Sequence, residues 1–259
     1  MRYKYMTGYE EREIQTIVDT IDDILAARGD LPATTGRPAV LDLFDQVVVT
    51  LILARQNVTQ ELVGGWFGLS QPRVSQIVSV VEPLIEAALE GVELTPEEAA
   101  DKRTLVVDGT YVPTGNRKAT GRANYSGKRH CQCLSVQVAC DTNGRLLAVS
   151  DPVPGARHDA AAIGLCGWAD TLAGADWIAD GAYSAAGAIT PIKRKPGLGL
   201  CDSQKQFNHD LSGIRYVVER CIAHLKNWKT LKTGWRRQLK KLPAMIRLIT
   251  KLELYRLAH

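Results

Sequence analysis

The sequence lacks the features of membrane proteins, secreted proteins and zinc fingers. Its longest apolar run, VVVTLILA at 47–54, is far shorter than the roughly 20 residues of a membrane-spanning helix. The first residues, MRYKYMTGYEEREIQ, have no hydrophobic segment behind their basic side chains, so we expect no signal peptide. The six cysteines include no Cys-x-x-Cys pair. We therefore expect a soluble, cytoplasmic protein with reduced thiols.

Histidine is also scarce, with five residues in the chain. The pair His158-Asp159 could belong to a histidine-rich metal site, but the other histidines are not spaced to complete one. Cys131 and Cys133 alternate on a predicted strand beside His130, so both thiols face one side. A zinc site is one interpretation of this group, and structural thiols are the other. The absence of a second ligand pair favours structural thiols.

Charge is unevenly distributed along the chain. From Arg215 to the end there are 12 Lys and Arg against two Glu, whereas the other 214 residues carry 20 bases and 26 acids. A basic region on a near-neutral body indicates a polyanionic partner at one face. A solvated helix face would give the same bias, so charge alone does not decide.

The first half of the chain has helical periodicity. Apolar residues recur at helical spacing over residues 8–28, and Gly29 ends this helix. The segment 31–38, with two prolines, is a predicted linker, and a mostly apolar helix over 39–55 follows it.

Residues 57–85 have the pattern of a helix-turn-helix. Thr59 can cap a short helix that ends at Gly68, and Ser70 can cap a second helix with Pro72 in its first turn. The second helix would bury its valines and isoleucine and expose a polar face near its N-terminus, made of Gln71, Arg73, Ser75 and Gln76. Such a face can read bases in the major groove of DNA. An ordinary helical hairpin is the alternative.

Beyond a charged, loop-like boundary at 92–103, the periodicity changes to that of strands. The sequence predicts three strands joined by short turns, then a helix, two more strands, a loop and a final helix. Their expected ranges, in order, are 104–113, 133–141, 145–154, 159–172, 177–184, 189–195, 196–210 and the helix that includes 215–226. The second half is therefore an α/β domain with a mixed sheet.

Three carboxylates stand where such a domain forms clefts. Asp108 and Asp180 each close an apolar strand and precede a glycine, and neighbouring strands would bring them together. Glu219 can complete the cluster from the final helix. Clustered acids repel unless a cation neutralises them, and carboxylates without His or Cys suit Mg²⁺ or Mn²⁺. Singly, each acid would be an ordinary turn or surface residue.

The helix RYVVERCIAHLK sets Glu219 among bases. At about 100° per residue, Arg215, Glu219 and Lys226 lie within roughly 40° of one another. They follow the border of an apolar stripe, which consists of Ile214, Val217, Val218, Cys221, Ile222, Leu225 and Trp228.

These motifs together resemble those of a bacterial insertion-sequence transposase of the DDE class, with a Harbinger-like catalytic domain and an N-terminal helix-turn-helix. VVDGTYVP is similar to the motif of the first aspartate, IADGAY to that of the second, and YSGKRHCQCLSVQVACD with PGARHD to the stretch between. Arg215, Glu219 and Lys226 match Y-x2-R-x3-E-x6-K, but Ser212 stands in the tyrosine position. The resemblance covers about residues 40–235.

The resemblance implies a ribonuclease-H-like fold, a mixed five-stranded sheet with flanking helices, preceded by an all-α helix-turn-helix domain. The implied division is 1–36 for a helix and linker, 37–92 for the DNA-binding domain, and 104–259 for the catalytic domain with basic C-terminal helices. Asp108, Asp180 and Glu219 would be the catalytic residues and would hold two Mg²⁺ or Mn²⁺ ions. The implied activity is binding of terminal inverted repeats, strand cleavage and strand transfer, by a homodimer or larger assembly on double-stranded DNA.

Basic residues near these acids are candidates for phosphate contacts. Arg215 and Lys226 share the face of Glu219, and a basic run around Tyr125 contains Lys118, Arg122, Lys128 and Arg129. We interpret Asp159 as a helix N-cap near the site. Two alternatives to a transposase stay open: a metal-dependent nuclease of the same fold that does not transpose, and a DNA-binding regulator whose catalytic domain is inactive.

Overall fold

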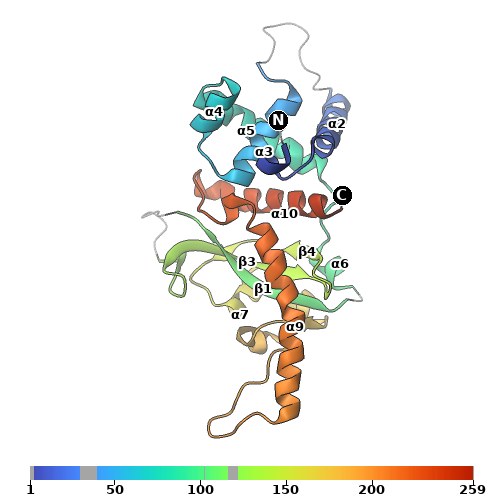
Figure 1. Ribbon diagram of the computed structural model, residues 1–259, viewed down its shortest axis with the longest axis vertical. Coiled ribbons are helices and arrows are strands. Elements are labelled where there is room, and N and C mark those ends of the chain that lie inside the picture. The colour runs from blue at the N-terminus through green and yellow to red at the C-terminus, as the bar shows by residue number, and fades with distance from the viewer. Residues whose placement is uncertain (1–2, 30–39, 102, 116–121, 259) are drawn as a thin grey trace.

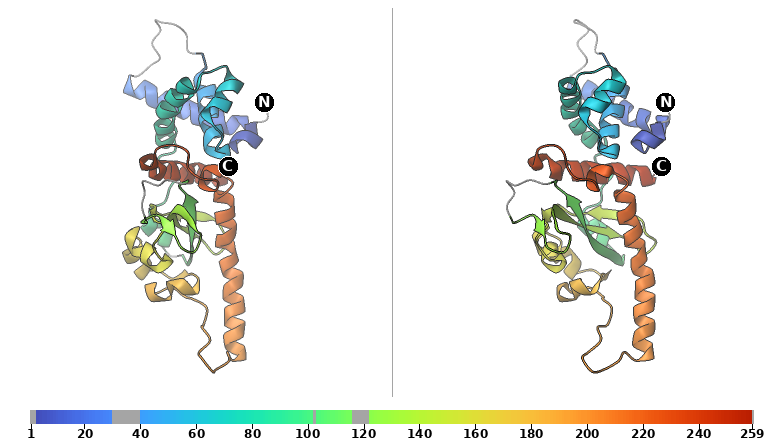
Figure 2. Two further views of the ribbon diagram at one scale, coloured as in Figure 1. Left: turned by 90° about the vertical axis from the view of Figure 1, so that its left-hand side faces the viewer. Right: turned by 60° about the vertical axis from the view of Figure 1, so that its left-hand side comes forward.

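Helices come first along the chain, and a sheet with further helices follows. The computed structural model describes residues 3–29, 40–101, 103–115 and 122–258. The last helix, α10 (Leu242–Ala258), lies between the N-terminal helices and the sheet, which places it in the middle of the molecule (Figures 1 and 2). Among the described residues, no helix has the length and apolar character required to cross a membrane.

Three helices open the chain. They are α1 (Tyr3–Thr7), α2 (Glu11–Arg28) and α3 (Leu43–Gln56). The helix predicted over 8–28 thus begins at Glu11, where Glu10 and Glu13 form a capping box, and it ends at Gly29 as predicted. Asp42 caps α3 by accepting a hydrogen bond from the Asp45 N–H. The linker predicted at 31–38 lies within 30–39, outside the described residues.

The next two helices are those of the predicted helix-turn-helix, α4 (Gln60–Phe67) and α5 (Gln71–Ala88). The Thr59 hydroxyl accepts from the Leu62 N–H, and left-handed Gly68 ends α4. Gly64 permits the close turn, because a Cβ there would lie 2.5 Å from the Leu69 carbonyl oxygen. Ser70 precedes α5 as predicted, although its side chain makes no capping hydrogen bond. Val74, Ile77, Val78 and Val81 are buried as predicted.

The sheet is mixed, as predicted. Its segments are β1 (Leu105–Pro113), β2 (Tyr125–Ser126), β3 (Cys131–Cys140), β4 (Leu146–Val149), β5 (Val153–Pro154) and β6 (Trp177–Ile178). Strand β3 runs antiparallel to β1, β4 and β5, whereas β6 runs parallel to β1. The predicted turn at 141–145 joins β3 to β4, with the Asp141 N–H donating to the Arg145 carbonyl.

The described sheet has six strand segments, not the five predicted. The strand expected at 145–154 is split into β4 and β5, because the Ser150 hydroxyl accepts from the Gln137 N–H and Pro152 has no N–H to donate. The strand expected at 189–195 is reduced to one bridge between Ile178 and Ile189. The short β2 was not predicted.

Several helices also differ from expectation. The loop expected at 92–103 contains α6 (Pro96–Ala100), which starts with a capping box between Thr95 and Glu98. The helix expected over 159–172 is two helices, α7 (Asp159–Leu165) and α8 (Ala169–Ala173), separated at left-handed Gly167. Three short 3₁₀ helices complete the described elements: η2 (Gly181–Ala186), η3 (Lys229–Leu231) and η4 (Leu239–Lys241).

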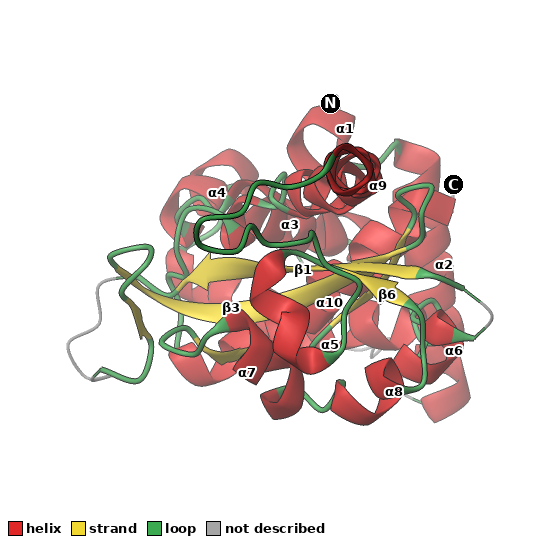
Figure 3. Ribbon diagram, turned by 90° about the horizontal axis from the view of Figure 1, so that it is seen from below, coloured by secondary structure: helices red, strands yellow, loops and turns green. Residues whose placement is uncertain are grey.

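The long helix α9 (Asp202–Leu225) crosses one face of the sheet, and α7 and α8 lie on the other (Figure 3). It begins within the loop predicted at 196–210, where Cys201 and Gln204 form a capping box. Its first turns project beyond the body of the molecule (Figures 1 and 2). Ile214, predicted to be buried, is therefore 36% exposed, whereas Val218 and Leu225 are buried against the sheet.

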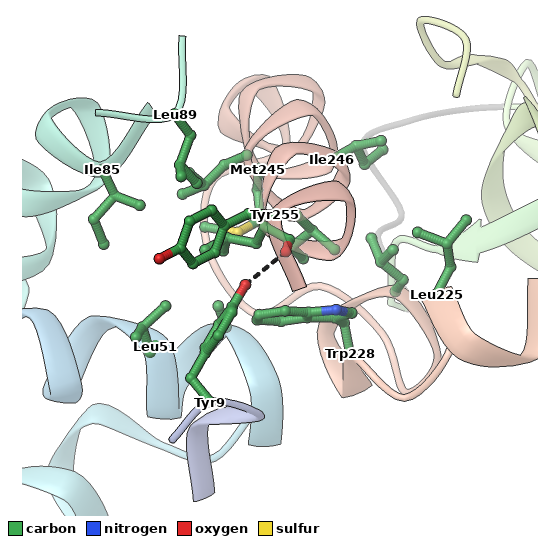
Figure 4. Close-up of a cluster of buried hydrophobic side chains, with 14 of the residues drawn as sticks. Tyr9, Leu51, Ile85, Leu89, Leu225, Trp228, Met245, Ile246 and Tyr255 are labelled. Carbon is green, nitrogen blue, oxygen red and sulfur yellow. Dashed lines mark hydrogen bonds between the residues drawn. The ribbon is translucent and has the colours of Figure 1, made fainter. Parts of the chain in front are cut away.

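One hydrophobic core joins the N-terminal helices, α10, α9 and one face of the sheet. At its centre the Tyr9 hydroxyl donates to the Leu252 carbonyl at 2.6 Å, and Trp228 packs beside them (Figure 4). The Trp228 indole N–H donates to the fully buried Glu253 at 2.9 Å, and Arg256 pairs with the same carboxylate. A smaller core on the other face contains Trp177 and Tyr183.

Candidate active site

Asp108 lies within β1, because the strand continues to Pro113. We had predicted that it ends the strand, but Gly109 keeps an extended backbone and pairs with Gln137 in the sheet. One Asp108 oxygen accepts from the Gly109 N–H at 2.8 Å. A side chain larger than hydrogen does not fit at Gly109, since a Cβ would lie 2.8 Å from the Tyr183 hydroxyl.

Asp180 follows β6 and begins η2, where its carboxylate accepts from the Ala182 N–H at 2.7 Å. The parallel register pairs Val106 with Ile178. Asp108 and Asp180 each stand two residues further along, so the register places the two aspartates side by side. Each aspartate accepts a hydrogen bond from a backbone N–H through one of its oxygens.

Glu219 approaches the aspartates from α9. Its side chain is exposed, and it lines the same cleft as Asp108 and Asp180. This cleft has a volume of about 690 Å³, and its charged lining also includes Asp159, Arg215, Lys128 and Arg129. The structure thus brings the three predicted acids to one cleft, together with bases predicted to contact phosphate.

The electrostatics of Asp108 reflect its neighbours. Burial raises the pKa of its carboxyl group, the Gly109 N–H and Arg215 lower it, and the charges of Asp180 and Asp159 raise it. The aspartates therefore repel one another, and a cation between them would relieve that repulsion.

The donor chemistry suits a hard divalent cation, because the acids offer oxygen ligands only. The three acids do not form a compact ligand shell, since among the described residues no three His, Cys, Asp or Glu side chains are grouped closely enough to hold a metal ion. Glu219 therefore shares the cleft with the two aspartates, but a bound ion would have to draw the three carboxylates together.

Comparison with known proteins shows the family of the chain. Residues 107–252 match the family described as DDE superfamily endonuclease, and residues 39–91 match the helix-turn-helix of DDE superfamily endonuclease. The chain belongs to the DDE superfamily of endonucleases. The family resemblance drawn from the sequence motifs is thereby confirmed.

Two relatives match this chain over most of its length. A putative transposase for insertion sequence element IS112 of Streptomyces albus G is 30% identical over 212 residues, which is 81% of this chain and 78% of the relative. A probable transposase for insertion sequence element IS702 of Microchaete diplosiphon is 25% identical over 268 residues, or 99% of this chain and 95% of the relative. No solved structure matches the chain.

A buried polar pair behind this DDE superfamily site was not predicted. The Tyr183 hydroxyl donates to the Gln137 side-chain oxygen at 2.6 Å, and both residues are fully buried. Burial and the charges of Asp159, Asp108 and Asp180 raise the pKa of Tyr183 far above its ordinary value, so it stays a neutral donor. Its position in the IADGAY motif was the available signal, but nothing in the sequence indicated Gln137 as its partner.

Lys226 lies away from the cleft lining. Its ammonium donates to the carbonyl oxygens of Leu231, at 2.9 Å, and Tyr111, and it lies 4.7 Å from the Tyr111 ring centre. Burial lowers the pKa of Lys226 to about 8. The phosphate contact predicted for Lys226 stays a prediction, and the inward direction of this side chain does not favour it.

The other predicted phosphate contacts are better placed. Arg129 is exposed and lines the cleft, with its guanidinium 4.7 Å from the Tyr111 ring centre. Lys128 and Arg122 are exposed, and Arg215 is half-buried with its Nε unpartnered within the described chain. Lys118 lies outside the described residues.

On α5 all four predicted DNA-contacting side chains are exposed: Gln71, Arg73, Ser75 and Gln76. Gln71 donates to the Gln60 side chain at 2.6 Å, and Arg73 donates to Gln76 at 3.2 Å.

Two smaller predictions can be compared with the structure. The N-cap of α7 is His158, so Asp159 is the first helical residue and not the cap. Cys131 and Cys133 are free thiols on β3, and burial raises the pKa of Cys133 to about 11.

Proposed function

We propose that the protein is a DNA transposase that binds the terminal inverted repeats of a mobile element, cleaves the strands at the element ends and joins them to a target. The observation that carries this proposal is that Asp108 on β1 and Asp180, two residues beyond the parallel strand β6, line one cleft with Glu219. Water would cleave the phosphodiester to free a 3′-OH, and this hydroxyl would then attack a phosphodiester of the target.

The proposed catalytic fold is ribonuclease-H-like. The strand order β4-β3-β1-β6 supports it, with the first three antiparallel, β6 parallel to β1 and a later helix carrying Glu219. We retain the division into 1–36, 37–92 and 104–259 as a proposal. The continuous core makes these parts one folded body.

Asp108, Asp180 and Glu219 are the proposed ligands of Mg²⁺ or Mn²⁺, with two ions in the site. The bound ions would neutralise the phosphate and lower the pKa of the attacking water. The chain itself orients the two aspartates through the Gly109 and Ala182 N–H groups. Arg215 stabilises the ionised Asp108, while Lys128 and Arg129 hold the DNA backbone at the rim.

Two element ends must be processed together, so we propose that a homodimer or larger assembly forms on double-stranded DNA. A nuclease of the same fold would cleave without joining, and an inactive regulator would bind without cleaving. These alternatives differ from a transposase in a strand-joining assay.

The test is Asp108→Ala, assayed with duplex DNA carrying the ends of the encoding element. We expect Mg²⁺-dependent cleavage and joining to fall by about a thousandfold or more, while DNA affinity is unchanged. The matched control is Asp170→Asn on α8, an exposed carboxylate outside the cleft, which should cleave normally. Undiminished cleavage by the Asp108 variant would refute the assignment.

A further inference from the structure

A second groove lies beside α5, on the helical side of the molecule. One wall consists of Ser75, Gln76 and Ser79 on the exposed face of α5, and the other of Arg236, Gln238 and Lys241 near η4. We call this the α5 groove. Its basic wall belongs to the chain that follows the catalytic helix α9, about 160 residues beyond α5 in sequence.

The basic wall is fixed to the helix-turn-helix. Arg237 forms a half-buried bidentate pair with Glu82 of α5, and its guanidinium lies 4.7 Å from the ring centre of buried Trp235. The Asn57 amide donates to the Thr233 hydroxyl and the Gly234 carbonyl, at 2.7 and 2.9 Å. The segment therefore keeps a defined position against α5.

The charge of the α5 groove is of one sign. Arg236 and Lys241 are exposed, and Arg237 is compensated by Glu82. Within the described residues, no carboxylate lines the groove. An uncompensated pair of bases next to an exposed, uncharged helix face is complementary to a sugar–phosphate strand.

We propose that the α5 groove holds one backbone strand of the DNA duplex whose bases α5 contacts, with Arg236 and Lys241 each binding a phosphate. The inference rests on the proposed DNA-binding function and adds a second set of contacts, supplied by the C-terminal half of the chain. Phosphate contacts beside a recognition helix fix its register on the duplex without reading sequence.

The test measures salt dependence of binding by the full chain to a short duplex of mixed sequence. The variant is Arg236→Gln with Lys241→Gln, and fluorescence anisotropy is followed from about 50 to about 200 mM salt. Loss of two phosphate contacts should make the slope of log K against log salt shallower by about 1.8. A charge-matched control, Arg12→Gln with Arg28→Gln on the exposed side of α2, should keep the wild-type slope.

A charge-retaining variant, Arg236→Lys with Lys241→Arg, should also keep the slope, since a phosphate contact needs charge at that position. A wild-type slope in the Gln variant, or a slope lost in the charge-retaining variant, overturns the groove proposal alone. Absence of duplex binding by the wild-type chain at the lowest salt overturns the DNA-binding function and the groove proposal together.

Discussion

The active-site cleft and the α5 groove are built in opposite ways. The cleft gathers acids from β1, from the segment after β6 and from α9, and backbone N–H groups orient Asp108 and Asp180. The groove presents two exposed bases, Arg236 in a loop and Lys241 in η4, with uncharged side chains of α5 opposite. Acids that hold a metal need fixed positions, whereas bases that hold phosphate need charge and reach. The difference teaches that the cleft combines charges of both signs, with Lys128, Arg129 and Arg215 beside the acids, whereas the α5 groove carries bases without acids.

These two regions are nevertheless parts of one body. The core around Trp228 and Tyr9 packs α10 against both the N-terminal helices and the sheet. We therefore predict that DNA cleavage and DNA binding can be altered separately, although the chain unfolds as one cooperative unit.

The largest expected effect is on DNA cleavage, and it tests whether cleavage and DNA binding depend on different residues. Glu219→Gln removes the charge of the α9 carboxylate while keeping its size, so DNA cleavage should fall by about a thousandfold with affinity for duplex DNA unchanged. The control is Asp202→Asn on the same helix, whose side chain is 99% exposed. Parallel loss of cleavage and affinity would show that cleft and groove are not independent.

The second effect is on stability, and it tests whether the chain unfolds as one body. Trp228 is fully buried and bonded to Glu253, so Trp228→Ala should lower the unfolding free energy by about 3–5 kcal/mol. Urea unfolding followed by circular dichroism should remain one transition. Trp66→Ala on α4, at 52% exposed, should cost less than about 1 kcal/mol. Two transitions in either variant would divide the chain into independent parts.

The third effect concerns the turn between α4 and α5, which sets the position of α5. Gly64→Ala places a methyl group against the Leu69 carbonyl and should cost roughly 2–3 kcal/mol, with weaker DNA binding. Its neighbour Gly65 has no atom within 4 Å of an added Cβ. Gly65→Ala should therefore stabilise the protein, by about 1 kcal/mol. Equal effects of the two variants in urea unfolding would refute the close approach.

The smallest effect distinguishes buried from exposed bases. Folding lowers the pKa of Lys226 from 10.5 to about 8, so between these values the unfolded chain binds more protons and stability rises with pH. Relative to Lys226→Met, the wild type should gain about 2 kcal/mol of unfolding free energy from about pH 8 to about pH 10. Lys241→Met, which removes an exposed base, should show no such pH-dependent difference from the wild type.

Sequence predicted best the parts whose signals are local. Thr59, Gly68 and the turn at Leu69 lie within a few residues of the helices they define, and α4 and α5 form as expected. The turn between β3 and β4 was likewise indicated by its own residues, with the Asp141 carboxylate accepting from the Asn143 and Arg145 N–H groups.

Features that depend on distant partners were missed. Helix α9 begins at Asp202 although its first turns contact little, so apolar periodicity did not indicate them. The helical face of Lys226 was predictable, but its hydrogen-bond acceptors, the carbonyls of Tyr111 and Leu231, were not. The shared cleft of Asp108, Asp180 and Glu219 agrees with expectation, and their catalytic roles stay predictions.

The placement of α10 between the helices and the sheet has a geometric consequence. Tyr9 and Tyr255 donate hydrogen bonds across this junction to the carbonyls of Leu252 and Glu13, so α10 ties the N-terminal helices to the part of the chain that holds the cleft. Under the proposed function, the protein would then fix the number of base pairs between the sequence that it recognises and the bond that it cleaves. Substrates with extra base pairs inserted in that interval would be cut at the displaced position, at an unaltered distance from the recognised sequence.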